Sequence, residues 1–105
     1  MSIKVSVIIP TYNGDKTLNG TIISVLNQTL QEIEIIISDD VSKDNTRKII
    51  EDFSQKYPDK IRYIFMKQNS RGSGVINEGV KAAKGKYIAI IDQDDWMDSS
   101  MLEKL

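Results

Sequence analysis

Five aspartates stand directly after two short apolar runs of this 105-residue sequence, in the groups Asp39-Asp40 and Asp92-Gln93-Asp94-Asp95. No basic residue is adjacent to either group. Carboxylates that gather without a positive partner repel one another, so a cation between them would stabilise their charged form. Carboxylates spaced as Asp-x-Asp offer hard oxygen ligands to Mg²⁺ or Mn²⁺, and water and phosphate usually complete the shell. The spacing therefore indicates a divalent cation held by Asp94 and Asp92.

These acids also have a structural explanation, because aspartate is common in turns and at helix starts, where its side chain accepts backbone N–H groups. For Asp39-Asp40 the two explanations weigh equally. The structural one is favoured for Asp95 and Asp98. For Asp92 with Asp94, which directly follow a buried strand, the ligand-binding explanation is favoured.

Three further residues near these acids have two interpretations each. Tyr12 is either a ligand-stacking ring or an aromatic at the edge of the core, and Trp96 can simply plug the end of a sheet. Arg71 lies in the glycine-containing stretch 69–74. A cation and glycines at a helix start suit a phosphate, although a solvated loop charge is the simpler reading.

Composition excludes several other kinds of chemistry. The chain has no Cys and no His, so thiolate and imidazole metal sites, cysteine nucleophiles and histidine bases are excluded. Its net charge of -1 argues against nucleic-acid binding. No Gly-x-Gly-x-x-Gly follows the first apolar run, and no Walker loop is present. A phosphoacceptor signalling domain stays open, although no Lys is obviously placed to support one. We expect a cytoplasmic protein, because no apolar run approaches the ~20 residues of a spanning helix.

Short apolar runs and helical patterns alternate along the chain. Runs with the length of strands buried on both faces occupy residues 5–9, 33–37 and 87–91, and a weaker one occupies 61–66. Helical spacing of apolar residues occurs within 18–29, 49–57 and 75–83. This alternation predicts an α/β fold with a mostly parallel sheet and helices on both faces. We also expect the strand order 3-2-1-4, which brings the ends of the first and last strands together at the point where the order reverses.

Polar residues suggest where the helices begin. Asp15 is expected to cap the first helix, and Ser42 or Asp44 the second. Ser100 and Glu103 have the spacing of a capping box, which predicts a last helix. The chain stops barely one turn later, so we expect it to be the N-terminal part of a longer protein.

Five blocks of the sequence resemble, in order, the N-terminal nucleotide-binding half of family 2 glycosyltransferases with the GT-A fold. They are residues 5–13, 24–29, 34–40, 83–88 and 92–96. A lone Asp-x-Asp is a weak signal, whereas five ordered blocks over the whole chain are specific. The sequence departs from the family at Val41, where Gly is more usual. Valine tolerates positive φ poorly, so we expect the turn there to differ in shape.

The resemblance implies that residues 1–105 are the nucleotide-sugar-binding part of a GT-A domain that lacks its acceptor part. It implies nucleotide contacts at Pro10, Thr11, Tyr12, Asn13, Asp39, Asp40, Arg71, Asp92 and Gln93. The first three of these would border uracil and ribose, with the Tyr12 ring stacking on the base. Asp40, or less favourably Asp39, would accept the N3–H of the base. Arg71 would lie near the base or diphosphate.

At the other end of the nucleotide, the resemblance places Asp92 at the hydroxyls of the sugar or ribose, and Asp94 at a Mn²⁺ or Mg²⁺ ion that bridges the phosphates. It implies transfer of a sugar, with inversion, from a UDP-sugar to a glycan or lipid-linked acceptor in surface polysaccharide synthesis. The general base is expected downstream of Leu105, so this stretch alone would be inactive.

Further expectations concern partners. An exposed sheet edge would favour self-association, and the full-length protein can lie at the inner face of the membrane. The rival interpretation of the resemblance is a nucleotide-binding module without catalysis.

Overall fold

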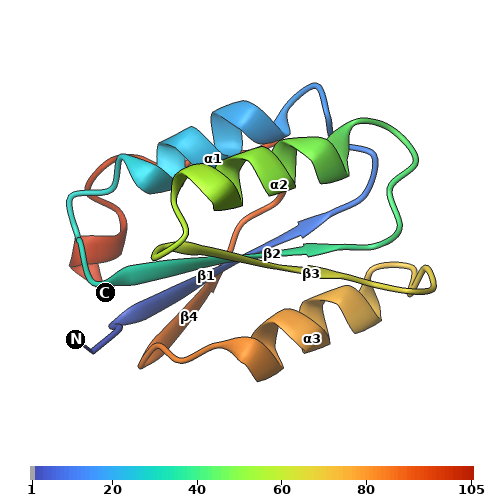
Figure 1. Cartoon of the computed structure of the whole chain (residues 1–105). Helices are drawn as coiled ribbons and strands as arrows, with labels where there is room; N and C mark the ends of the chain where they lie inside the picture. Colours follow the sequence, from blue (N-terminus) through green and yellow to red (C-terminus); the bar gives the residue numbers. More distant parts are fainter. Residues whose placement is uncertain (1) are drawn as a thin grey trace.

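A four-stranded sheet carries the chain in the computed structural model, which describes residues 2–105 (Figure 1). Its strand order is β3-β2-β1-β4 and every neighbouring pair is parallel, so the predicted order is confirmed. The elements in chain order are β1 (Val5–Thr11), α1 (Leu18–Leu26), β2 (Ile33–Asp39), α2 (Thr46–Lys56), β3 (Ile61–Phe65), α3 (Ser73–Ala82), β4 (Tyr87–Ile90) and a final 3₁₀ turn, η1 (Leu102–Lys104).

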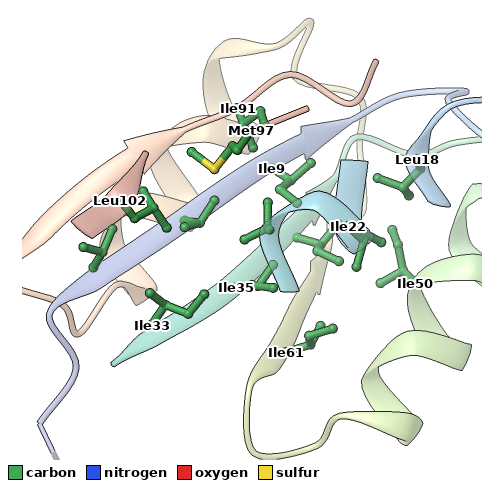
Figure 2. Packing of buried hydrophobic residues seen from close by; sticks show 14 residues of the cluster. Ile9, Leu18, Ile22, Ile33, Ile35, Ile50, Ile61, Ile91, Met97 and Leu102 are labelled. Carbon is green, nitrogen blue, oxygen red and sulfur yellow. The ribbon is translucent and has the colours of Figure 1, made fainter. Parts of the chain in front are cut away.

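Helices cover both faces of the central strands, as the apolar runs predicted. The prediction that residues 87–91 are buried on both faces is wrong for β4, because this edge strand leaves Tyr87, Ile88 and Ile90 exposed. Helices α1 and α2 lie on one face and α3 on the other (Figure 1). Alternate residues of the central strands point to opposite faces, so Ile33, Ile35 and Ile37 join the cluster under α1 and α2. Figure 2 shows this cluster, in which Ile22 and Ile50 from the two helices meet the strands. The central strands are therefore fixed by packing on both sides, and their ends are fixed with them.

Helix α3 packs very closely on its face of the sheet. A Cβ atom at Gly79 would lie 2.7 Å from Ile8 Cγ2 and 3.0 Å from Ser38 Oγ. Only glycine allows this approach, because any side chain would push the helix away from β1 and β2. The close packing brings the start of α3, and residues 69–72 before it, to the carboxyl ends of the strands.

The predicted helix caps are partly wrong. Thr17 rather than Asp15 is the N-cap of α1, and it makes no side-chain cap bond. The Asp15 carboxylate instead accepts the backbone N–H of Asn45 at 3.3 Å, joining the two loops at this end of the sheet. The N-cap of α2 is Asn45 rather than Ser42 or Asp44, and it makes no side-chain cap bond. Asp44 lies one residue earlier, and its carboxylate accepts the N–H of Thr46 at 2.9 Å.

The predicted capping box near the end of the chain does not form. The Ser100 hydroxyl donates to Asp98 Oδ1 at 3.0 Å, and Glu103 accepts a bond from the Thr29 hydroxyl at 2.7 Å. Both side chains are thus used outside a helix start, and the segment forms only η1. No helix among residues 2–105 has the length and apolar character needed to cross a membrane.

A buried carboxylate, Glu34, ties the amino ends of the strands together. It accepts bonds from Ser6 Oγ at 2.6 Å, Lys84 N at 2.7 Å and Arg62 Nη2 at 2.6 Å. Burial raises the pKa of Glu34, but these hydrogen bonds and the Arg62 charge outweigh it and bring the pKa below its ordinary value of 4.5. The charged form is therefore the one that stabilises the fold.

We expect folding stability to fall with acid through Glu34. Its pKa is lower in the folded than in the unfolded chain, so its contribution is complete above pH 4.5 and is lost as the pH falls through the folded value. Urea unfolding should show that Glu34→Gln costs about 1 to 3 kcal/mol at neutral pH and flattens the loss of stability in acid. Glu51→Gln, on the exposed side of α2, is the control and should keep the wild-type pH dependence. A Glu34→Gln curve parallel to the wild-type curve would contradict this account.

Candidate functional site

A pocket of about 620 Å³ opens at the carboxyl ends of the strands. This is the edge where ligands bind in open parallel sheets, next to the point where the strand order reverses. We call it the strand-end pocket. Its lining residues are Pro10, Thr11, Tyr12, Asp40, Asn69, Arg71, Gly72, Val75, Asp92, Gln93 and Asp94.

Most residues that the sequence predicted for a ligand site line this pocket, and two do not. The exceptions are Asn13 and Asp39. The pocket also has three lining residues that sequence reasoning missed, namely Asn69, Gly72 and Val75. The glycine-containing stretch 69–74 before α3 pointed to Asn69 and Gly72, but only Arg71 was proposed from this stretch as a ligand contact.

Asp39 does not line the pocket, because its carboxylate is fully buried on the α1/α2 side of the sheet. It accepts bonds from Thr11 Oγ1 at 2.7 Å, Ser42 N at 2.9 Å and Arg47 Nε at 2.8 Å. Arg47 also donates to the Met66 carbonyl at 2.9 Å. The structural explanation therefore applies to Asp39, which joins β1, α2 and the turn after β2.

Asn13 is likewise used for structure. Its side-chain oxygen accepts Lys43 N at 2.8 Å, and its own N–H donates to Ser42 Oγ at 2.9 Å. Val41, in the turn after β2, adopts φ 66°, so a valine occupies the left-handed region here. The bonds on either side of Val41 hold this strained conformation.

Asp40, one residue after Asp39, faces the opposite side of the sheet and lines the pocket. Its buried carboxylate accepts Ser70 N at 2.6 Å, Gly72 N at 3.0 Å and Ser70 Oγ at 3.1 Å. Burial raises the pKa of Asp40, but these bonds outweigh it and lower the pKa, so the group is ionised at neutral pH. A carboxylate has about four acceptor positions, and three are occupied here, which leaves one for a donor in the pocket.

Gln93 lines the pocket, but its carboxamide is bonded to the chain. Oε1 accepts Tyr12 N at 2.8 Å, and Nε2 donates to the Tyr12 carbonyl at 2.9 Å. The carboxamide also lies so close to Gly14 that a Cβ there would collide with it. This pair of bonds fixes the backbone of Tyr12, while its side chain stays 45% exposed at the pocket.

Asp92 and Asp94 are both exposed and both line the pocket. Among residues 2–105, no cluster of three acidic side chains forms a closed metal cage. Two accessible carboxylates fit a Mg²⁺-like or Mn²⁺ ion, which keeps water in its shell and takes phosphate oxygens from a ligand. Asp95 and Asp98 instead make turn bonds, to Trp96 N and Ser100 N, as the structural explanation predicted.

Known proteins resemble this chain in sequence and in structure. The profile of Glycosyl transferase family 2 matches residues 6–105. One relative is TarP of Staphylococcus aureus, a poly(ribitol-phosphate) beta-N-acetylglucosaminyltransferase. It is 41% identical over an alignment of 105 positions, which covers 97% of this chain and 32% of TarP. The crystal structure of S. aureus TarS 1-349 in complex with UDP matches with a TM-score of 0.89 at 30% identity, over 97% of this chain and 30% of the TarS 1-349 chain.

A more distant structure has the same fold. The mannosyltransferase PcManGT of Pyrobaculum calidifontis, solved with GDP-Man and Mn²⁺, matches with a TM-score of 0.87 over 97% of this chain and 31% of its own. At 22% identity, this likeness shows the fold alone. The chain thus spans roughly a third of the length of the relatives it matches. With the GT-A type of sheet in place and the profile match covering nearly every residue, the chain belongs to glycosyl transferase family 2.

Proposed function

We propose that residues 1–105 are the donor-binding part of a glycosyltransferase that uses a UDP-sugar and transfers its sugar to an acceptor hydroxyl with inversion. The observation that carries this proposal is the arrangement of the strand-end pocket. Ionised Asp40 lies at the end of β2, and Asp92 and Asp94 lie beyond β4, with the end of β1 between them. A nucleoside diphosphate has a base with N–H donors at one end and a charged diphosphate at the other. The TarS structures, solved with UDP and with UDP-GlcNAc, support the choice of donor.

The base is bound by Asp40 and Tyr12 in this proposal. The free acceptor position of Asp40 takes the imide N3–H of uracil, and the exposed ring of Tyr12 stacks on the base. Cytosine has no N–H at this position, so the carboxylate would meet a lone pair instead. An unpaired buried acceptor is costly, and this cost selects the base.

The diphosphate is bound by Arg71 and by the acids beyond β4. Arg71 lines the pocket immediately before Gly72, and its guanidinium is suited to phosphate oxygens. Asp94, with Asp92, would hold a divalent cation, which when bound supplies positive charge to the leaving diphosphate. The N–H of Gly72 is used by Asp40, so the charge of Arg71 rather than this amide is available to the phosphates.

In the transfer step, the acceptor oxygen forms a bond to the anomeric carbon as the bond from that carbon to the diphosphate oxygen breaks. The electron pair of the broken bond leaves with UDP. The proton of the acceptor hydroxyl passes to a carboxylate base that we place downstream of Leu105. By itself the chain is then expected to bind the donor without transferring the sugar.

Calorimetry with UDP, TDP, GDP and CDP in the presence of Mn²⁺ tests the proposal. UDP should bind tightest and CDP weakest, because only the base without the N–H donor leaves Asp40 unpaired. Asp40→Asn should weaken uridine and UDP alike, by about fivefold, the value of one hydrogen bond of about 1 kcal/mol. If CDP bound the wild-type chain as tightly as UDP, the proposed base contact would be wrong.

We also propose that the chain self-associates through β4, the edge strand that pairs with β1. Its Tyr87, Ile88 and Ile90 are exposed, and an open apolar edge invites strand pairing. Sedimentation at rising concentration should show a growing dimer fraction, which Ile90→Lys reduces. Val80→Lys, at an exposed apolar position of α3, is the matched control and should leave it unchanged. A single monomeric species at every concentration would contradict the idea.

The acceptor and the cellular setting complete the proposal. TarP is named as a poly(ribitol-phosphate) beta-N-acetylglucosaminyltransferase, and TuaG of Bacillus subtilis as a putative teichuronic acid biosynthesis glycosyltransferase. These names support a glycan or lipid-linked acceptor in surface polysaccharide synthesis. Such acceptors favour a cytoplasmic protein at the inner face of the membrane.

A further inference from the structure

A second hollow, of about 430 Å³, lies next to the strand-end pocket and shares one residue with it, Asp94. We call it the Trp96 groove. Its lining is mostly apolar atoms and hydroxyls, from Thr17, Gly20, Thr21, Ile23, Ser24, Asp94, Asp95 and Trp96. One side of the groove is the exposed surface of α1, and the other is the segment after β4. The two hollows are therefore neighbours on either side of Asp94.

Trp96 is exposed, yet its backbone is firmly held. The residue as a whole is 69% exposed. The Thr21 hydroxyl on α1 lies within donating distance of two carbonyl oxygens, those of Gln93 at 2.8 Å and Asp95 at 2.5 Å, and Met97 N donates to Ser24 Oγ at 3.0 Å. A large aromatic ring on a fixed backbone, left open to solvent, has the features of a ligand-contact residue rather than of a loose loop tip.

Gly20 gives an independent indication from the other side of the groove. It lies inside α1, where glycine is less favourable than alanine. A Cβ atom at this position would meet nothing within 4 Å, so no contact within the described residues requires a glycine. Ile23, one turn further along the same helix, is 48% exposed. The glycine thus keeps the groove wide beside an apolar surface.

We infer that the Trp96 groove binds a pyranose ring of the acceptor glycan, stacked on the indole. This inference rests on the proposed function. An acceptor oxygen must approach the anomeric carbon from the side away from the leaving diphosphate, and the diphosphate is placed at Asp94. The hollow that continues beyond Asp94 is this groove. The C–H face of a pyranose suits an exposed indole, and its hydroxyls can bond to the Thr17 side chain at the N-cap of α1.

The single tryptophan of the chain makes the test direct, because all indole fluorescence comes from Trp96. The chain, loaded with UDP and Mg²⁺, is titrated with maltotriose, chitotriose, mannotriose and β-1,4-galactotriose. Mg²⁺ is used because it is diamagnetic and leaves the NMR signals of nearby amides observable. At least one of these sugars should change the emission in a saturable way. The same sugar should shift the backbone amide NMR signals of Gly20 and Ile23.

Variants separate stacking from general surface effects. Followed by the Ile23 amide signal, Trp96→Ala should weaken sugar binding at least fivefold, and Trp96→Phe should recover part of the loss. Gly20→Leu should also weaken it, by filling the groove. Tyr87→Ala removes another exposed aromatic, at the amino end of β4, and should change nothing.

The outcomes distinguish this inference from the proposed function. All variants should keep the wild-type affinity for UDP with Mn²⁺. If UDP binds but none of the four sugars affects Trp96, Gly20 or Ile23, the groove is not an acceptor site, and a surface for another protein segment becomes the better explanation. If the wild-type chain fails to bind UDP, the proposed function itself fails.

Discussion

Asp94→Asn should lower the affinity of the chain for UDP with Mn²⁺ by at least about tenfold, or ~1.4 kcal/mol. The substitution keeps the shape of the side chain and removes its charge. An ionised carboxylate at the edge of the strand-end pocket can share a divalent cation with the diphosphate, whereas a neutral amide is a much weaker ligand for such an ion. Calorimetric titration of the wild-type chain and of Asp94→Asn with UDP, with and without Mn²⁺, measures the effect.

Two comparisons make this result specific to the metal bridge. Uridine has no phosphates, so Asp94→Asn should leave its binding almost unchanged. Asp98→Asn is the matched control, because Asp98 is an exposed acid that bonds to Ser100 and lies outside the pocket. Equal losses for uridine and UDP in Asp94→Asn would show that Asp94 does not act through a phosphate-bound ion.

Asp39→Ala should destabilise the fold by about 2 to 4 kcal/mol, measured by urea unfolding. The change removes a fully buried carboxylate and leaves Ser42 N and Arg47 Nε without their acceptor. The Thr11 hydroxyl keeps only its longer contact with the Ser38 carbonyl, at 3.4 Å. Arg47 is partly exposed and stacks over the Phe65 ring at 4.4 Å, so water can solvate part of its charge. For this reason we expect a smaller loss of unfolding free energy than the largest losses seen when a buried ion pair is broken.

Asp52→Ala is the surface control, because Asp52 pairs with Lys48 at 3.5 Å on the exposed side of α2. It should cost no more than about 0.5 kcal/mol. The double change Asp39→Leu with Arg47→Met should recover part of the loss, since it removes both charges together. A loss in Asp39→Ala as small as that of Asp52→Ala would mean that the buried network contributes little.

The fold was predictable because its two central strands are buried on both faces. Residues 35–37 are three consecutive isoleucines, without the alternation of a strand that has one exposed face, and this is typical of a parallel strand between two helical layers. The strand order followed from the connections and the family resemblance. The structure of the last segment was not predictable from its capping residues. Ser100 bonds to Asp98 and Glu103 bonds to Thr29, so neither side chain caps a helix.

The site was predictable at the level of strand ends but not of single side chains. Asp39 and Asp40 are adjacent in sequence, and they point to opposite faces because successive residues alternate there. From the sequence alone, either aspartate could contact a ligand. The structure distinguishes them, because Asp40 lies on the face that holds Ser70 and Gly72, whereas Asp39 lies on the face that holds Arg47. Gln93 was expected to bind the nucleotide, and its actual partner, Tyr12, is 81 positions away in sequence.

The carboxamide of Gln93 extends the pairing of β1 with β4 past the point where the strands themselves part. Its two bonds to Tyr12 imitate one rung of a backbone ladder, made by a side chain. The backbone of Tyr12 and the segment that carries the acids after β4 are therefore joined before any ligand arrives. The conformational entropy of aligning them is lost during folding, so it is not lost again when a ligand spans both. A ligand that binds at one end of the pocket then requires no rearrangement of the backbone at the other end.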